Sequence, residues 1–306
     1  MSPARGAVEV RVDQRTLRLT NLDKVYWPEA GFTKGQMIEY YTRIAPVLLP
    51  HLRDRPLTLK RYPEGVDGEM FYEKNCPKHR PPWMETARVW SGSNSRDMYY
   101  CMVQDLPSLV WVGQLGTIEL HTSLSRYRKL TQPTMLVFDL DPGPPATIVE
   151  CCRVARWLRE WFLARDMQSF PKTSGSKGLQ IYVPINRAAD YDQAKRISRG
   201  LAQQLEREHP QDVVHLQRKT LREGKVLIDW SQNDDAKTTV SVYSLRARAR
   251  PTVSTPVTWD EVESCLEAAD PSLLVFDSEA ILERVDRLGD LFEPVLKLKQ
   301  KLPASV

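Results

Sequence analysis

The sequence has little of what builds cross-linked scaffolds. Only five of its 306 residues are cysteines, and Cys151 and Cys152 are adjacent. So few cysteines, in an odd number, do not make a disulfide framework in a chain of this length, so we expect reduced thiols. The segment Cys76-Pro77-Lys78-His79 has no second pair of ligands to complete a four-ligand zinc site. Disulfide-rich and zinc-stapled classes are therefore not expected.

Long apolar runs and a large net charge are lacking as well. No run approaches the ~18 residues of a membrane span, and the N-terminus has no apolar signal-peptide core. The formal net charge is only +4, with 42% hydrophobic and 27% charged residues. This composition is typical of an ordinary globular protein of the cytoplasm.

Two carboxylates end a strongly apolar stretch. Residues 136–141, LVFDLD, lie between Pro133 and a Pro-Gly-Pro-Pro sequence, which favours a short buried strand over a helix. Alternate residues of a strand point to the same face about 6.5–7 Å apart, so Asp139 and Asp141 can project together. Their hard oxygen atoms suit Mg²⁺ or Mn²⁺. In isolation, an Asp-Pro ending is also ordinary turn chemistry.

A second apolar stretch, residues 225–232 (KVLIDWSQ), ends in the carboxylate of Asp229. Three carboxylates from adjacent strand ends form the usual cage for two divalent ions ~3.5–4 Å apart, which clamp a transferring phosphoryl group. Together, the three aspartates predict a nucleotidyl-transfer enzyme.

Other stretches suit phosphate and nucleic acid. Residues 1–62 contain eleven Lys/Arg against six acids, and a basic lobe attracts phosphates. Phe71 and Tyr72, near Lys60 and Arg61, resemble a base-stacking platform, although an adjacent aromatic pair is more often part core and part rim. Residues 173–178, TSGSKG, have the parts of a phosphate cradle, but they are not a Walker A loop.

Hydrophobic periodicity predicts the elements that carry these stretches. We expect helices at about 33–52, 106–115, 147–164, 191–208, 259–269 and 279–288, and strands at about 8–19, 56–62, 84–89, 97–103, 118–121 and 238–245. The polar loop 91–96 is a candidate mobile segment, and the lysine-rich end 295–303 is expected to fray. We predict a single compact domain over 1–306, with an N-terminal lobe at about 1–130 and a second lobe at about 131–306.

Six ordered stretches resemble the polymerase domain of bacterial and archaeal ATP-dependent DNA ligase D, a branch of the archaeo-eukaryotic primase superfamily. They are NLDKVYWP, LKRYPEGVDGEMFYEK, LVFDLDPG, TSGSKGLQIYVP, REGKVLIDWSQND and KTTVSVYSLRARARP, which cover most of residues 21–251. The resemblance implies an α+β fold: an RRM-like catalytic palm with a mixed or antiparallel sheet flanked by helices, and a smaller N-terminal α/β lobe that binds DNA ends.

The resemblance also implies an activity. It is that of a templated DNA polymerase of non-homologous end joining, which fills gaps and extends ends with a preference for ribonucleotides, using two Mn²⁺ or Mg²⁺ ions. The implied partners are DNA with gaps or breaks bearing a 5′-phosphate, NTPs or dNTPs, the Ku end-binding protein and an ATP-dependent DNA ligase, at the nucleoid.

Residue roles follow from the same resemblance. Asp139, Asp141 and Asp229 resemble the catalytic metal triad. The nucleotide-binding positions correspond to His121, Ser174, Lys177, Gln180 and Arg246. The DNA-binding positions correspond to Asn21, Lys24 and Lys34 for the 5′-phosphate, to Lys60, Arg61, Phe71 and Tyr72 along the template, and to Arg222 near the site. The chain departs from the family at Gln180, where histidine is common, and at Thr122-Ser123, where Pro-Trp is usual.

Other functions stay open. A haloacid-dehalogenase-type phosphatase also has DxD after a strand, but its usual Asp-Gly-Thr continuation is absent here and Asp229 would have no role. A DNA-end-binding scaffold whose metal site no longer works is the non-enzymatic alternative. A primase that starts chains unaided would leave Lys24 and Lys34 without a purpose.

Overall fold

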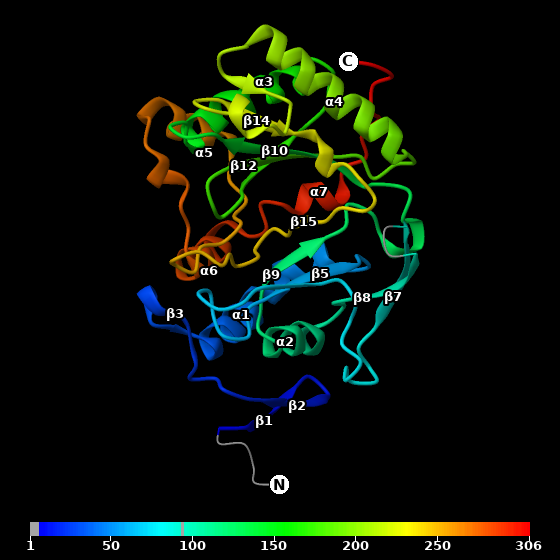
Figure 1. Ribbon diagram of the computed structural model, residues 1–306, viewed down its shortest axis with the longest axis vertical. Coiled ribbons are helices and arrows are strands. Elements are labelled where there is room, and N and C mark those ends of the chain that lie inside the picture. The colour runs from blue at the N-terminus through cyan, green and yellow to red at the C-terminus, as the bar shows by residue number, and fades with distance from the viewer. Residues whose placement is uncertain (1–5, 93–94) are drawn as a thin grey trace. The chain divides into compact units, whose positions relative to one another are not determined.

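The computed structural model describes residues 6–92 and 95–306 (Figure 1). Residue contacts divide the chain into two compact units. Unit 1 holds Met1–Ser123, Tyr243–Val253 and Asp277–Gly289, and unit 2 holds Leu124–Val242, Ser254–Phe276 and Asp290–Val306. Two late segments of the chain therefore return to unit 1, whereas the single domain with lobes at about 1–130 and 131–306 stays a prediction. Among the described residues, no helix combines the length and the apolar character that a membrane crossing requires.

Unit 1 combines antiparallel strands with helices. Its strands are β1 (Val8–Val12), β2 (Arg15–Leu19), β3 (Val25–Trp27), β4 (Phe32–Thr33), β5 (Leu57–Arg61), β6 (Phe71–Glu73), β7 (Thr86–Ser91), β8 (Arg96–Cys101) and β9 (Thr117–Thr122). Its helices are α1 (Lys34–Leu52), α2 (Leu106–Gln114) and α6 (Ser278–Leu288). In the larger sheet, β5 pairs antiparallel with β6, β8 and β9, and β7 pairs with β8. This sheet carries several of the predicted site residues.

Helix α1 begins where the sequence predicts. The Thr33 side chain accepts a hydrogen bond from the backbone N–H of Gln36, and the Gln36 side chain accepts one from the backbone N–H of Thr33. Such caps are worth about 1 kcal/mol. The helix continues through Pro46 and buries an apolar face that includes Tyr40 and Tyr41. The predicted assignment of these aromatics to the core is confirmed.

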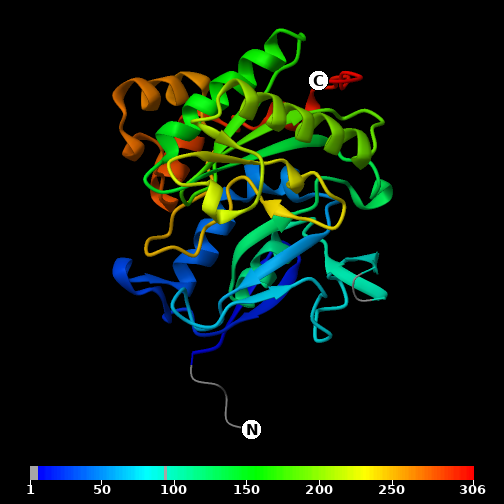
Figure 2. The same cartoon turned by 45° about the horizontal axis from the view of Figure 1, so that its top comes forward.

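Unit 2 is built on a five-stranded mixed sheet covered by helices (Figures 1 and 2). The strands of this sheet are β10 (Met135–Pro142), β11 (Phe170–Thr173), β12 (Leu179–Pro184), β13 (Val213–Val214) and β14 (Val226–Asp229), and the short β15 (Thr239–Val240) of unit 2 is not part of it. The helices of unit 2 are α3 (Ile148–Leu163), α4 (Tyr191–Glu208), α5 (Trp259–Ala268) and α7 (Glu293–Lys297). The sheet order is β11-β12-β10-β14-β13, antiparallel except for the parallel pair β13–β14. The predicted α+β fold with a mixed sheet is confirmed.

The two faces of the unit 2 sheet differ in chemistry. Leu136, Phe138 and Leu140 of β10 lie in a hydrophobic core with side chains of α3 and α4. Because side chains alternate along a strand, Asp139 and Asp141 project from the opposite face. The sequence alternation of β10 therefore separates the packing face from the face that carries carboxylates.

Three expectations from the sequence are wrong. Cys76 and Cys101 form a disulfide, although Cys151 and Cys152 are free and buried. The strand predicted at 238–245 is limited to Thr239–Val240. The C-terminal segment predicted to fray contains part of α7 and buries Val295 and Leu302. In the predicted loop 91–96, the strands extend to Ser91 and Arg96, and residues 93–94 lie outside the described part of the chain.

Candidate active site

Strand pairing in unit 2 brings two of the predicted aspartates together. Asp139 of β10 is the direct antiparallel partner of Asp229 of β14. Directly opposed residues point to the same face with Cβ atoms about 4.5–5.5 Å apart. Asp141 lies two residues along β10 on that same face and is exposed. The chain thus places all three carboxylates on one face of one sheet.

The pKa of Asp139 reflects the closeness of the three carboxylates. Burial, together with the negative charges of Asp141 and Asp229, raises the pKa of Asp139 to about 7. A hydrogen bond from Gln180 and the positive charge of Lys172 act in the opposite direction. The carboxylates therefore repel one another, and a nearby cation would relieve the repulsion.

The Asp229 carboxylate is engaged by residues that follow it. One oxygen accepts hydrogen bonds from Ser231 N at 3.0 Å and Ser231 Oγ at 2.6 Å, and the other accepts from Gln232 Nε2 at 2.9 Å. Within residues 6–92 and 95–306, no group of three or more His, Cys, Asp or Glu side chains converges as a metal site would require. The three aspartates thus share a face and a register, but their side chains do not form a closed cage.

The polar face continues across the sheet as a row of four residues. Gln180 of β12 lies opposite Asp139, and Lys172 of β11 lies opposite Gln180. We call the four residues Lys172, Gln180, Asp139 and Asp229 the acidic row. The Tyr182 hydroxyl donates to Gln180 Oε1 at 3.4 Å, which turns the amide so that its NH₂ can donate to Asp139.

Lys172 is a member of this row that the sequence reasoning missed. Its side chain is fully buried, and its Nζ donates to Ser254 Oγ at 2.6 Å. It lies over the Tyr182 ring at 5.4 Å from the centroid. Fully buried lysines are rare unless paired. The only signal in the sequence was its position one residue before the TSGSKG loop.

The TSGSKG loop is packed against the strand that carries the aspartates. Ser174 Oγ accepts hydrogen bonds from the backbone N–H groups of Ser176 and Gly178. A Cβ atom on Gly178 would lie 2.1 Å from the carbonyl oxygen of Leu140, so only glycine permits this approach. Lys177 is exposed on this loop. The loop therefore lies beside Asp139 and Asp141.

Arg222 is positioned by a similar close approach. A Cβ atom on Gly143 would lie 1.8 Å from the Arg222 carbonyl oxygen, which places this segment against the end of β10. The Arg222 guanidinium donates to Gln217 Oε1 at 2.7 Å. Arg222 thus lies near the end of the aspartate strand, as predicted from the motif.

In unit 1, a second group of predicted residues surrounds one buried carboxylate. Glu119 of β9 lies 2.9 Å from His121 Nε2, 3.3 Å from Lys60 Nζ and 3.3 Å from Arg246 Nε. Lys60 also lies within 5.6 Å of the centroid of Tyr72, its partner on β6. We call Lys60, Glu119, His121 and Arg246 the cationic cluster.

Burial lowers the pKa of His121, whereas its hydrogen bond to Glu119 raises it, and the charges of Arg246 and Lys60 lower it further. The Tyr72 ring contacts the imidazole edge-on, with centroids 6.3 Å apart. The predicted template residue Tyr72 and the predicted nucleotide residue His121 are therefore neighbours.

The predicted 5′-phosphate residues Lys24 and Lys34 are also close together. The Lys34 backbone N–H donates to the Lys24 carbonyl at 2.8 Å. Burial, together with the charges of Lys24 and Arg61, lowers the pKa of Lys34 to about 8. Lys34 Nζ donates to the Thr20 carbonyl at 3.0 Å, and exposed Asn21 follows directly in the left-handed conformation, with φ 55°.

The remaining template residues lie on β5 and β6. Arg61 pairs with Glu73 at 2.5 Å. Phe71 and Tyr72 are 44% and 60% exposed, so this aromatic pair belongs to the surface and not to the core. Large exposed aromatics beside cations suit base stacking.

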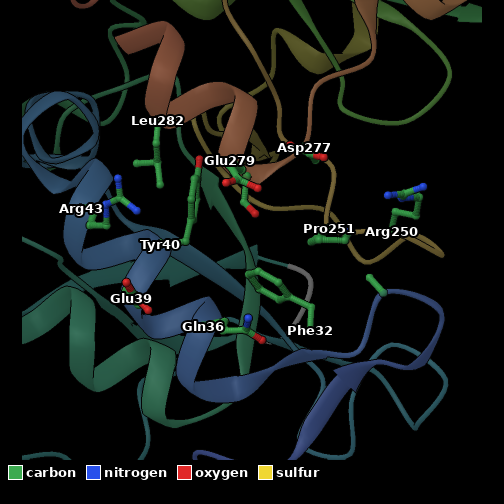
Figure 3. A pocket seen from close by; sticks show the side chains of 12 residues that line it. Phe32, Gln36, Glu39, Tyr40, Arg43, Arg250, Pro251, Asp277, Glu279 and Leu282 are labelled. Atoms are coloured by element: carbon green, nitrogen blue, oxygen red, sulfur yellow. The ribbon is translucent and has the colours of Figure 1, made fainter. Parts of the chain in front are cut away.

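Cavities add little to this picture. A cavity of about 340 Å³ in unit 1 lies between α1 and α6, and Figure 3 shows its lining side chains. Its charges are mixed, with Arg43 and Arg250 against Glu39 and Glu279, and no predicted site residue lines it. A more open hollow of about 480 Å³ includes Tyr72, Lys74 and Lys78.

Fold and site together define a class of protein. The chain has a mixed α+β fold, and its carboxylates lie at strand ends. It also has a glycine-rich loop with a lysine, and a cationic cluster. These are the parts of a primase-type nucleotidyltransferase. Comparison with known proteins gives the family. The family model described as "LigD, primase-polymerase domain" matches residues 33–292, and the chain belongs to this family.

Individual relatives agree with the family. The multifunctional non-homologous end joining protein LigD of Mycolicibacterium smegmatis is 41% identical over 281 residues, which cover 91% of this chain and 36% of that protein. The bifunctional LigD of Bacillus subtilis is 28% identical, covering 94% of this chain and 46% of that protein. The chain thus spans less than half the length of these relatives.

A solved structure is similar over nearly the whole chain. The polymerase domain from Mycobacterium tuberculosis Ligase D in complex with DNA superposes with a TM-score of 0.86 at 37% identity, covering 94% of this chain and 100% of that one. The family and the primase-like α+β fold expected from the sequence are confirmed. The chain is an enzyme of the nucleotidyltransferase class, whose members use divalent metal ions and nucleoside triphosphates, and the phosphatase alternative is excluded.

Proposed function

We propose that this chain is a DNA-directed polymerase of non-homologous end joining. It adds nucleotides, preferably ribonucleotides, to a 3′-hydroxyl at gaps or broken ends and recognises the downstream 5′-phosphate. The observation that carries the proposal is the register of Asp139 against Asp229, with Asp141 on the same face. The relative solved with DNA, whose whole length this chain matches, supports the choice of DNA as the substrate.

The acidic row fits two hard divalent cations in its donor chemistry. Its carboxylate oxygens are the ligands that Mg²⁺ and Mn²⁺ prefer, and their mutual repulsion favours a bound cation. Asp139, Asp141 and Asp229 would hold the ions, which supply Lewis-acid stabilisation of phosphoryl oxygens. Gln180 orients Asp139 through its amide, and Ser231 and Gln232 orient Asp229.

Cationic side chains bind the phosphates. In unit 2, Lys177 and Arg222 provide charge-assisted hydrogen bonds to phosphate oxygens. In unit 1, Arg246 can do the same, and both Arg246 and His121 contact Glu119. Ser174 keeps the Lys177 loop in shape through its two backbone contacts. Lys24 and Lys34 bind the 5′-phosphate, because a dianion stabilises the charged form of Lys34, which burial and the charges of Lys24 and Arg61 disfavour.

We place the chain in the cytoplasm at the nucleoid. Ku would deliver the broken ends, and an ATP-dependent DNA ligase would seal the strand after extension. These partners follow from the non-homologous end joining role of the relatives in which this domain is found.

Primer extension on a gapped duplex tests the function. Wild-type protein with Mn²⁺ should extend the primer, faster with NTP than with dNTP and faster with a 5′-phosphate than with a 5′-hydroxyl at the gap. Asp139→Ala should lose extension while DNA binding persists, because the carboxylates hold metal and not the DNA backbone. The exposed acid Asp260 supplies the control, and Asp260→Ala should extend like wild type.

A DNA-end-binding scaffold is the second candidate, favoured by the engagement of both Asp229 oxygens with protein donors. It would bind 5′-phosphorylated gaps tightly and extend none of them with any nucleotide or metal. Extension that depends on Asp139 would eliminate this alternative.

A further inference from the structure

We propose that Glu119 is a positioning residue that holds Lys60, His121 and Arg246 together as one triphosphate-binding unit. The inference rests on the proposed polymerase function and adds a residue to its nucleotide site. Nothing in the motif reasoning assigned Glu119 a role, because an acid between two apolar strand residues has no distinctive spacing.

The contacts of Glu119 single it out. Its side chain is only 1% exposed, and it contacts the nitrogen atoms of all three basic residues at 2.9–3.3 Å. It also accepts a hydrogen bond from the backbone N–H of Ala247 at 3.1 Å. The Arg246 contact is an ion pair and not an aligned hydrogen bond, since Nε lacks a well-directed acceptor.

The basic residues reach Glu119 from three segments of unit 1. Lys60 on β5 is its direct cross-strand partner, and His121 lies two residues along β9 on the same face. Arg246 comes from the segment Tyr243–Val253, which is fixed by hydrogen bonds from Leu120 N to Ser244 Oγ and from Leu245 N to the Tyr41 hydroxyl. Glu119 is thus the shared contact of residues that are far apart in the sequence.

Electrostatics explains why one shared carboxylate is needed. Lys60 and Arg246 both approach the same oxygen, Oε1, so without the carboxylate their charges would repel each other at close range. Burial alone would raise the pKa of Glu119, but the hydrogen bond with His121 and the charges of Arg246 and Lys60 hold it well below its usual range. Two permanent cations against one anion leave the cluster net positive, as a triphosphate requires.

The geometry also assigns the atoms that meet the ligand. Glu119 lies against the Nε edge of Arg246, and a guanidinium group is the side chain whose forked donors match phosphate oxygens. It takes Nε2 of His121, so the opposite ring nitrogen, Nδ1, can donate to a phosphate oxygen only when the imidazole is protonated. A carboxylate in this place therefore aims three side chains without touching the nucleotide itself.

The test is Glu119→Gln, which keeps the shape and one acceptor but removes the charge. The nucleotide KM in primer extension should rise about tenfold or more, the effect expected for losing charged hydrogen bonds, whereas kcat changes little. Direct binding of a fluorescent ATP analogue should weaken by the same factor.

A matched control uses the other carboxylate–imidazole pair of the chain. Glu206 on α4 pairs with His215 in unit 2, outside the cationic cluster. Glu206→Gln removes the same kind of contact and should leave the nucleotide KM at the wild-type value.

A double-mutant cycle separates positioning from general stability. If Glu119 acts through Arg246, Glu119→Gln should cost much less in the Arg246→Met background than in the wild type. Glu119→Asp, which keeps the charge but cannot reach all three partners, should give an intermediate KM and serves as the test if the glutamine variant does not fold. A nucleotide KM within twofold of wild type, or equal effects in both backgrounds, overturns the inference. Wild-type protein that extends no primer would instead refute the proposed function.

Discussion

Two sheet faces of this molecule carry rows of polar residues with opposite charge. In unit 2, the acidic row places Asp139 opposite Asp229, with Asp141 exposed on the same face. In unit 1, the cationic cluster gathers Lys60, His121 and Arg246 around Glu119. Cross-strand register builds both groups, because it aligns side chains from distant parts of the sequence on one face.

The acidic row and the cationic cluster differ in the sign of their net charge. The acidic row keeps an excess of negative charge that raises the pKa of Asp139, whereas the cationic cluster keeps an excess of positive charge. Each excess is unfavourable in the free protein and favourable once a ligand of the opposite charge binds. We therefore expect damage to the acidic row to affect the chemical step, and damage to the cationic cluster to affect nucleotide affinity.

The largest expected effect is on the chemical step. Asp139→Ala should lower kcat about a thousandfold or more, since metal stabilisation of the reacting phosphoryl group is worth several kcal/mol. Single-turnover extension on a gapped duplex measures this, with Asp260→Ala as the control. If Asp139→Ala raised the nucleotide KM and left kcat unchanged, the acidic row would not act on the chemical step.

The cationic cluster should show the complementary result. Arg246→Met should raise the nucleotide KM about tenfold to a hundredfold, because one charge-assisted contact to phosphate is lost. Steady-state extension over a range of NTP concentrations measures KM and kcat separately. Arg53, an exposed arginine of unit 1, gives the control Arg53→Met. Equal losses of kcat in Arg246→Met and Asp139→Ala would mean that the cationic cluster and the acidic row do not differ in role.

The acidic row also predicts how stability depends on pH. The pKa of Asp139 is about 7 in the folded protein, above the ordinary aspartate value of 3.8, so the folded state binds the proton more tightly. Because each pKa unit corresponds to ~1.4 kcal/mol, the metal-free protein should lose about 4 kcal/mol of stability as the pH rises from about 4 to about 7, with no further loss from this group above that. Urea unfolding with EDTA measures this. Asp139→Asn should remove this dependence, and an unchanged profile would contradict the assignment.

The sequence was sufficient for local features and insufficient for long-range ones. The helix start at Thr33 and the strand ending at Asp139 and Asp141 were predictable, because caps and alternation are written in neighbouring residues. The pairing of Asp139 with Asp229 was inferred only as neighbouring strand ends, since register joins segments about ninety residues apart. Lys172 and Glu119 were missed because a single charge in a strand resembles any solvated residue.

The wrong predictions also come from contacts between residues that are far apart in the sequence. The predicted strand at 238–245 has the β-branched composition of a strand, but only Thr239–Val240 is one, because contacts with Tyr40 and Tyr41 hold the following backbone at Tyr243 and Leu245 in an irregular path. Cys76 and Cys101 are 25 residues apart, and the backbone N–H of Cys76 donates to the Tyr99 carbonyl of β8, the strand that ends at Cys101. Neither outcome is visible in a local window.

The smallest expected effect concerns Lys172. Its positive charge lowers the pKa of Asp139, so Lys172→Met should move the pH range of the stability loss upward by less than about one unit. The same urea titrations detect the change, and Lys299→Met, at an exposed lysine, should not show it. A shift to lower pH would mean that Lys172 does not act on Asp139.

The central claim is that three aspartates on one sheet face bind divalent ions together. Mn²⁺ titration followed by electron paramagnetic resonance tests this without DNA or nucleotide. We predict that wild-type protein binds Mn²⁺ and that Asp229→Asn weakens binding about tenfold or more, because this residue reaches the site only through the register with Asp139. Equal Mn²⁺ affinity of the two proteins would contradict the account.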